Sequence, residues 1–290
     1  MNDQLRRDRH ALYERSVLDC VAQLETVDQL FRRRRARMPL TLGEDFCGTA
    51  AFSAAWVSSD PQRRAVAIDI DRATLAWAEQ HHRAPLGDAA TRLQLVCGDV
   101  REPRQNERLD LVVANNLSYC VFHDRATLRD YLRGACDALD AEGALVLDVH
   151  TGPDAQYVRQ FHVEHPRFTY VWDQRSFDPL THRRRCEIHF LFDDGDEMRA
   201  AFRYDWRLWS VPELSDLLLE VGFHDVEPHL VESTSAPART GGIDAQETAR
   251  SHGTAERPDS RAAAPRHPAR GGDAPALESL YLYLVAWRSS

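Results

Sequence analysis

The sequence of 290 residues contains no lysine, so all 36 of its basic residues are arginines. We attribute this absence to codon usage rather than to function. No apolar run is long enough to cross a membrane, and the N-terminus lacks the apolar stretch of a secretory signal. The six cysteines are scattered and form no C-x-x-C pair, which argues against a zinc site and favours reduced, buried thiols. These absences predict a cytoplasmic protein with no membrane segment and no bound metal.

Charge argues against general nucleic-acid binding, because the net charge is -9 at pH 7. One basic cluster occupies residues 32–37, at the end of a helical pattern that covers residues 8–37. Arginines at a helix C-terminus complement the helix dipole, and no aromatic residues interleave them to stack on bases. We therefore favour a solvated helix end, with RNA binding as the alternative.

Residues 40–50 predict a short strand, a tight turn and the start of a helix. Gly48 has no Cβ, so a ligand can approach the backbone closely there. Phe46 and Ala50 stand where a dinucleotide-binding turn would carry glycines, which argues against a nicotinamide oxidoreductase. Because Glu44 makes the turn acidic, a ligand with a positive charge and no phosphate fits better. S-adenosylmethionine is such a ligand.

Residues 44–50 resemble the first motif of the class I, Rossmann-like S-adenosylmethionine-dependent methyltransferases, which reads acidic-x-Gly-x-Gly-x-Gly. Glu44 matches the acid and Gly48 the middle glycine, whereas the outer glycines are replaced. Thr49 is predicted to cap the helix that follows. The resemblance implies cofactor contacts from Glu44, Phe46, Cys47, Gly48 and Thr49.

Acidic residues follow the next two predicted strands. Asp69 lies about 20 residues beyond the glycine turn, the spacing at which an acid binds ribose hydroxyls. We assign Asp71 to the cap of the next helix and place Ile70 beside the cofactor. Further on, a Gly-Asp turn resembles the adenine-binding motif of the family, which implies that Asp99 accepts from the adenine amine and the Val100 N–H donates to the ring.

The fourth predicted strand runs into a loop, residues 115–119, that would face the methyl group. Methyltransferases of adenine or glutamine amides often carry Asn/Asp-Pro-Pro-Tyr/Phe there, so this loop argues against such acceptors. We expect Asn115 beside the cofactor and Asn116 and Tyr119 on the catalytic side, although loop capping by asparagine is as plausible. His150 ends the fifth predicted strand, where ligands bind in open α/β sheets, and is a third catalytic candidate.

Residues 167–207 alternate in the manner of two or three antiparallel strands. The resemblance implies a substrate-side insertion over residues 150–207, and the N-terminal helical region often covers the active site in such enzymes. Substrate contacts are expected from Tyr13, Trp172, Arg207 and Trp209.

These patterns divide the chain into an N-terminal helical cover, residues 1–38, and a methyltransferase domain, residues 39–232 and 277–290. Residues 233–276 have almost no large apolar side chain and are predicted to be a disordered loop. The predicted fold is doubly wound α/β, with a seven-stranded, mostly parallel sheet that ends in an antiparallel hairpin.

The function implied is methyl transfer from S-adenosylmethionine to a small-molecule acceptor. Three alternatives stay open: an RNA methyltransferase that uses the 32–37 cluster, a nicotinamide oxidoreductase, which would need the missing glycines, and a non-catalytic module that only binds the cofactor. The pattern makes no prediction of an oligomeric state.

Overall fold

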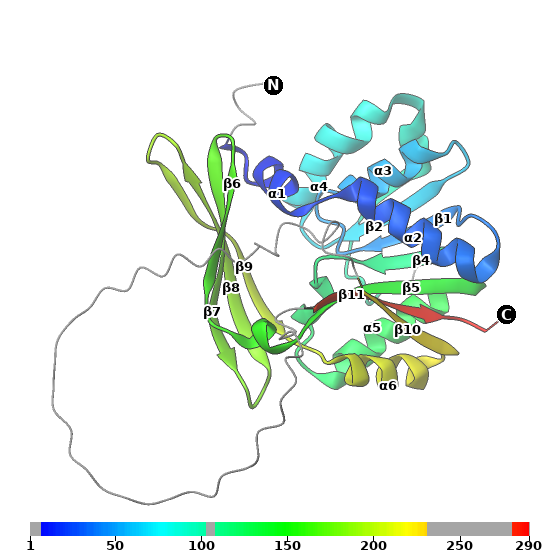
Figure 1. Ribbon diagram of the computed structural model, residues 1–290. Helices are drawn as coiled ribbons and strands as arrows, with labels where there is room; N and C mark the ends of the chain where they lie inside the picture. Colours follow the sequence, from blue (N-terminus) through cyan, green and yellow to red (C-terminus); the bar gives the residue numbers. More distant parts are fainter. Residues whose placement is uncertain (1–6, 103–107, 231–279, 290) are drawn as a thin grey trace, which may run out of the picture.

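The computed structural model describes residues 7–102, 108–230 and 280–289, and the predicted loop 233–276 lies outside them. Seven strands form the larger sheet, in the order β10-β11-β5-β4-β1-β2-β3 (Figure 1). β11 is antiparallel to both neighbours and every other pairing is parallel, which confirms the predicted sheet and its terminal hairpin. The strands are β1 (Thr41–Asp45), β2 (Arg64–Asp69), β3 (Leu93–Cys97), β4 (Leu109–Ala114), β5 (Leu139–Thr151), β10 (Asp225–Leu230) and β11 (Leu280–Trp287).

Both faces of this sheet are buried, as its apolar strands require. Alternate residues of β4 show this, because Leu111 and Val113 belong to one core cluster and Val112 and Ala114 to the other. The first cluster includes residues of α2 (Cys20–Arg35) and α3 (Ala51–Ser59), and the second includes residues of α5 (Arg125–Ala138) and α6 (Val211–Val221).

Local side-chain caps set the helix boundaries. Asp71 caps α4 (Arg72–Ala78) as predicted, and Ser210 forms a capping box with Glu213 at the start of α6. The predicted N-terminal helix is two helices, α1 (Arg9–Val17) and α2, because Asp19 begins the second one by accepting from the Ala22 N–H. The prediction that Thr49 caps α3 is wrong: the cap position is Ala50, and no side chain bonds there.

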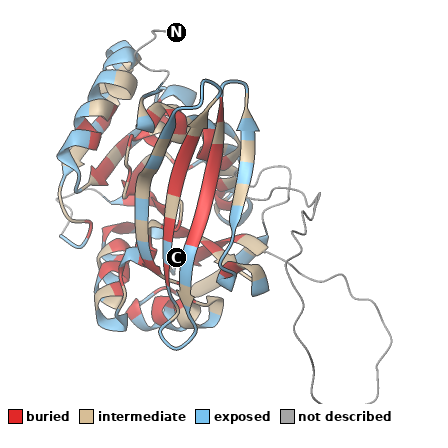
Figure 2. Cartoon of the chain, turned by 90° about the vertical axis from the view of Figure 1, so that its left-hand side faces the viewer, coloured by how far each residue is buried: buried red, intermediate tan, exposed pale blue. Residues whose placement is uncertain are grey.

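A second sheet of four antiparallel strands, β6-β7-β8-β9, stands across one end of the larger sheet (Figure 1). The sequence predicted two or three strands here, and β6 is the addition. Figure 2 looks onto this sheet, whose two central strands hold most of its buried residues. Their apolar alternation packs one face against the core beside α1. The strands are β6 (Gln160–His165), β7 (Phe168–Asp178), β8 (Arg183–Phe192) and β9 (Glu197–Arg207).

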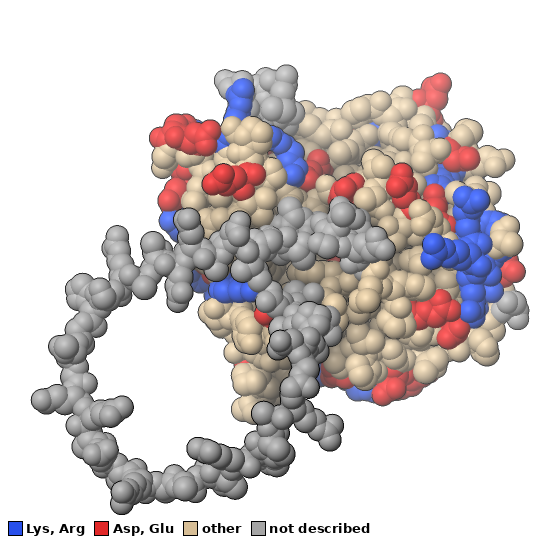
Figure 3. All heavy atoms as spheres, in the orientation of Figure 1, with Lys and Arg blue, Asp and Glu red and all other residues tan. Residues whose placement is uncertain are grey.

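The arginine cluster gathers at the end of α2, where Figure 3 shows a patch of basic side chains. Two of its members have acidic partners within the chain. Arg34 pairs with Asp225 and Glu227 of β10 at 2.9 Å each, and Arg37 pairs with Asp110 of β4 at 2.8 Å. These contacts tie α2 to the sheet, as expected of a helix end. Among the described residues, no helix has the length and apolar character needed to span a bilayer.

Candidate active site

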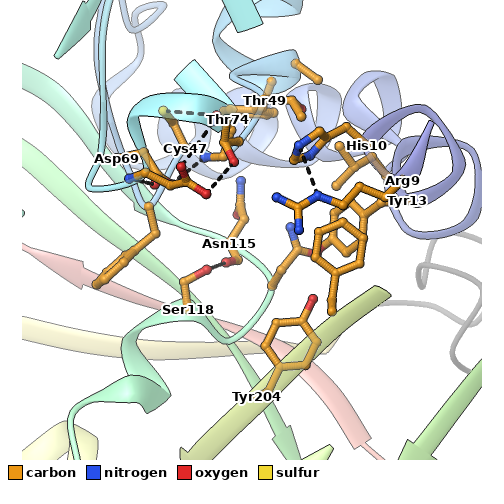
Figure 4. A pocket seen from close by; sticks show the side chains of 18 of the residues that line it. Arg9, His10, Tyr13, Cys47, Thr49, Asp69, Thr74, Asn115, Ser118 and Tyr204 are labelled. Carbon is orange, nitrogen blue, oxygen red and sulfur yellow. Dashed lines mark hydrogen bonds between the residues drawn. The ribbon is translucent and has the colours of Figure 1, made fainter. Parts of the chain in front are cut away.

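A cavity of about 520 Å³ lies at the carboxyl ends of β1, β2 and β4. The turn after β1 and the end of β2 form one wall, with Glu44, Phe46, Cys47, Gly48, Thr49 and Asp69. The loop after β4 contributes Asn115, Asn116 and Ser118. α1 and β9 close the opposite side with Arg9, His10, Tyr13, Phe202, Tyr204 and Trp206. Figure 4 shows the Asn115 side chain pointing into the space between Asp69 and the two tyrosines, Tyr13 and Tyr204.

The turn after β1 is left-handed at every second residue. Phe46, Gly48 and Ala50 have φ of 54°, 53° and 55°, and these are the three glycine positions of the motif. Left-handed backbone is strained for residues with a Cβ, so packing must stabilise this conformation at Phe46 and Ala50. The Phe46 ring lies 5.6 Å from Tyr131 and 5.8 Å from Phe122, centroid to centroid, and Ala50 is fully buried. The turn therefore keeps the backbone conformation of the motif, although two of the motif's three glycines are replaced.

Gly48 and Asp69 form an open, acidic part of this wall. No heavy atom lies within 4 Å of the point that a Cβ on Gly48 would occupy, so this backbone faces open space. The Gly48 N–H donates to Asp69 Oδ2 at 2.8 Å, and the Asp71 N–H donates to Oδ1 at 2.8 Å. Each carboxylate oxygen keeps a second lone pair with which it can accept from a hydroxyl.

Glu44 lies behind the turn and is 5% exposed. Its Oε2 accepts from the N–H of Ser53, at 2.9 Å, and from the Ser53 hydroxyl. Burial raises the pKa of Glu44 to about 7. The hydrogen bonds from Ser53 oppose this rise, whereas repulsion from the charges of Asp69 and Asp45 adds to it. The carboxyl therefore titrates near neutral pH, and a cation bound beside it would favour its charged form.

The side of the cavity formed by α1 and β9 contributes aromatic faces and the basic side chains of Arg9 and Arg203. Tyr13 packs against Phe202 with ring centroids 5.0 Å apart, and the Arg9 guanidinium lies 5.4 Å from the Phe202 centroid. Burial, and then the Arg9 charge, lower the pKa of His10. Sequence reasoning named Tyr13 but missed His10, Arg9 and the β9 residues. The sequence did contain evidence for the β9 residues: Phe202, Tyr204 and Trp206 are aromatic at every second position, which marks one face of a strand.

A family model described as a methyltransferase domain matches residues 46–145. The match begins inside the turn described above and includes the ends of β2 and β4. No curated protein matches the chain.

Solved structures with this fold cover nearly the whole chain. An S-adenosylmethionine-dependent methyltransferase from Clostridium acetobutylicum is 12% identical with a TM-score of 0.66, over 97% of this chain and 98% of that one. An amino pentose methyltransferase from Micromonospora echinaspora, with S-adenosylmethionine bound, is 16% identical with a TM-score of 0.64, over 97% and 96%. A sugar N-methyltransferase from Streptoalloteichus is 20% identical with a TM-score of 0.60, over 97% and 93%.

Residues 46–145 match a methyltransferase domain, and the chain has the fold of these solved S-adenosylmethionine-dependent methyltransferases. This fold is the one that the resemblance in residues 44–50 implied, and the amino pentose methyltransferase that shares it was solved with S-adenosylmethionine bound. At these identities the structural likeness establishes the fold and no more, so the cofactor and the acceptor are argued below from the chain's own cavity.

Two predicted catalytic residues lie outside the lining of this cavity. Tyr119 is 1% exposed, and its hydroxyl donates to the backbone oxygen of Asp148 at 3.1 Å. Burial raises its pKa well above the usual value, so it stays a neutral hydroxyl. His150 stacks on Tyr281, with centroids 4.2 Å apart, and borders a different, much smaller cavity. The extra turn at 118–121 carries Tyr119 into the core, which its spacing after β4 did not reveal.

Three predicted substrate residues are also placed elsewhere. Trp172 is buried in the second sheet and borders the small cavity. Arg207 pairs with Glu213 at 3.0 Å and lies over the Trp209 ring at 3.7 Å. The indole N–H of Trp209 donates to the Phe122 carbonyl at 3.0 Å. These side chains join β9 to the domain beneath it, so their contacts are structural, and only Tyr13 of the predicted four lines the large cavity.

The predicted adenine contacts, like Ile70, do not line the cavity. Asp99 accepts from the Arg101 side chain, which lowers its pKa, and Val100 is 6% exposed. Ile70, in contrast, is 74% exposed next to Asp69. The assignment of these three residues to the cofactor, with Asp99 and Val100 at the adenine, stays a prediction.

Proposed function

We propose that this protein transfers a methyl group from S-adenosylmethionine to a small polar acceptor built around a ring, and that amino sugars are the first class to test. The observation that carries the proposal is the aromatic cover of α1 and β9 opposite the cofactor turn. Tyr13 and Phe202 offer flat apolar faces to a ring, while Arg9 and Asn116 offer polar contacts at its edge. Solved structures of similar fold include an amino pentose and a sugar N-methyltransferase, which supports the choice of class.

S-adenosylmethionine supplies an activated methyl group when bound. We propose that Gly48 and Asp69 hold its nucleoside side, and that Glu44 attracts its positive charge. The cover then positions the acceptor and keeps water out, which are the main contributions a protein makes to such a displacement. His10 faces the same cavity with a lowered pKa, so it is neutral at pH 7 and able to accept a proton that the acceptor releases.

Labelled S-adenosylmethionine and matched acceptors test the proposal. Each amino sugar is paired with the analogue that has a hydroxyl in place of the amine, and a short RNA is included. We expect label on the amino compounds in preference to their hydroxyl analogues. Label on RNA would overturn the small-molecule assignment. Cofactor binding by calorimetry without transfer to any acceptor in a broad metabolite panel would favour the non-catalytic module.

A further inference from the structure

Arg184 of β8 is a buried cation without an acidic partner. It is 1% exposed, and no carboxylate of the described residues lies within ion-pair distance of it. The other fully buried arginine, Arg63, pairs with Asp28 at 2.5 Å. A guanidinium withdrawn from water needs a counter-charge or a full set of hydrogen bonds. Arg184 has neither from the part of the chain that the structure describes.

Its hydrogen bonds are few and long. Nη1 lies 3.4 Å from Gln174 Oε1 and 3.4 Å from His150 Nδ1. Nε and Nη2 are buried and have no partner among the described residues. The guanidinium carbon lies 5.2 Å from the Trp206 centroid, and this contact stabilises the charge but accepts none of the free N–H groups. A guanidinium has five N–H donors, so most of its capacity is unused.

A small cavity of about 20 Å³ borders Arg184, and His150 and Gln174 line it as well. This volume holds about one water-sized species. A second arginine, Arg159, also lines it and pairs with Asp154 at 3.1 Å. The cavity is therefore bordered by two guanidinium groups and one paired carboxylate.

One further carboxylate lies in the same region. The charges of Asp148 and Arg184 both act on the Tyr119 hydroxyl, with opposite effects on its pKa, so the two groups share this neighbourhood. Asp148 Oδ1 accepts from the Leu117 N–H at 2.8 Å. Its charge acts in the same neighbourhood, but Arg184 Nε and Nη2 still have no hydrogen-bond partner among the described residues.

We propose that Arg184 binds a small monovalent anion in this cavity, with chloride as the first candidate. This cavity is too small for phosphate or sulfate, and a single water would satisfy N–H groups without balancing the charge. Arg184 also lines a second cavity of about 280 Å³, but the carboxylates of Asp178 and Asp205 line it too and disfavour an anion there. Arg184 is not among the residues that line the large cavity, so an anionic group of the acceptor is not its partner. The anion would fix β8 beneath Trp206, which forms part of the acceptor side of the large cavity.

Bromide and thermal unfolding test the site in the full chain. Crystals of the wild type grown in bromide should show an anomalous peak within hydrogen-bond distance of Arg184 Nε or Nη2. In solution, the unfolding midpoint should rise with chloride to saturation when gluconate at equal ionic strength is the reference. Arg184→Met should lose this chloride-specific rise. Arg203→Met is the matched control, since Arg203 is exposed on the neighbouring strand and pairs with Glu187; it should keep the rise.

Three results would overturn the proposal. The first is the absence of a bromide peak at Arg184 in the wild type, which needs no variant to fold. The second is a peak without any chloride-specific rise in the midpoint, which would mean an adventitious ion only. The third is an equal chloride response in the wild type and Arg184→Met.

Discussion

The backbone N–H of Gly48 donates to Oδ2 of Asp69 over 2.8 Å, which joins the turn after β1 to the end of β2. The Asp69 backbone oxygen accepts from Gly98 at 3.1 Å, so the start of the turn after β3 is tied to the same residue. Asp69 thus connects the ends of three adjacent strands. A change at Gly48 or Asp69 is expected to alter the position of the cofactor as well as one of its contacts.

Replacement of Gly48 by valine should abolish cofactor binding, with a loss of at least ~100-fold in affinity, or about 3 kcal/mol. The new side chain would fill the open space over the turn, and φ of 53° is strained for any β-branched residue. Calorimetry with S-adenosylmethionine measures the loss. Gly87→Val is the matched control, because Gly87 has φ of 58°, open space around it and no place in the cavity. Equal affinity in Gly48→Val and wild type would contradict the assignment of this turn to the cofactor.

Asp69→Ala should weaken the binding of S-adenosylmethionine and S-adenosylhomocysteine in parallel, because both carry the ribose. Loss of charge-assisted hydrogen bonds corresponds to about 1–3 kcal/mol. Asp124→Ala is a suitable control, since Asp124 also accepts a backbone N–H, that of Thr127, but lies outside the cavity. If only one of the two ligands loses affinity, Asp69 does not act on the ribose.

The strands of the larger sheet and the turn after β1 could be predicted from sequence because each depends on local pattern. Buried strands, an acid at a strand end and a single glycine are visible in a few consecutive residues, and Gly48 and Asp69 lie together as expected. The position of Tyr119 was not visible in this way. It depends on the three-dimensional course of the loop after β4, where Asn116 and Leu117 take φ of 59° and 58° and redirect the chain.

The acceptor side was predicted in outline but not in its residues. Two segments outside the strand–helix repeat were expected to cover the site, and α1 and β9 do line the cavity. Trp172 and Trp209 were chosen because aromatic residues are common in binding sites. Tertiary packing instead buries Trp172 within the second sheet and Trp209 against Phe122, and it turns Phe202 and Tyr204 toward the cavity. Which face of an antiparallel strand meets the core cannot be read from alternation alone.

Glu44 should make stability fall as pH rises from about 4.5 to about 7. Its pKa in the folded protein is about 7, above the ordinary 4.5, so the folded state holds a proton that the unfolded state releases in this window. Stability therefore decreases with rising pH, by up to about 3 kcal/mol from this group. Urea unfolding of wild type and Glu44→Gln between pH 5 and 8 isolates the effect. The stability difference between them should shift in favour of the variant as pH rises, and a constant difference would refute the raised pKa.

Removal of α1 should greatly reduce methyl transfer but leave cofactor binding largely intact. A deletion that reached residue 30 would remove Val27 and Leu30 of α2 from the core in addition to Leu12 and Val17 of α1, whereas deletion of residues 1–18 removes only the α1 pair and leaves α2. The shorter deletion should reduce transfer at least ~100-fold, since water enters the site, while the affinity for S-adenosylhomocysteine changes by less than ~10-fold. Equal loss of both would place α1 in the cofactor site.

Point variants of the same cover give a finer test in the folded enzyme. Tyr13→Ala and Phe202→Ala each remove half of a ring pair whose centroids lie 5.0 Å apart. Each should raise the KM for the acceptor by ~10-fold or more and leave the Kd for S-adenosylhomocysteine nearly unchanged, because neither ring belongs to the cofactor wall. Arg207→Met is the control: Arg207 stacks on Trp209 outside the cavity, so its loss should lower stability without a change in acceptor KM. The opposite result, a higher KM for Arg207→Met and an unchanged KM for the two ring variants, would contradict this assignment. It would mean that the acceptor binds on the other side of β9, with Arg207 as the substrate contact that the sequence predicted.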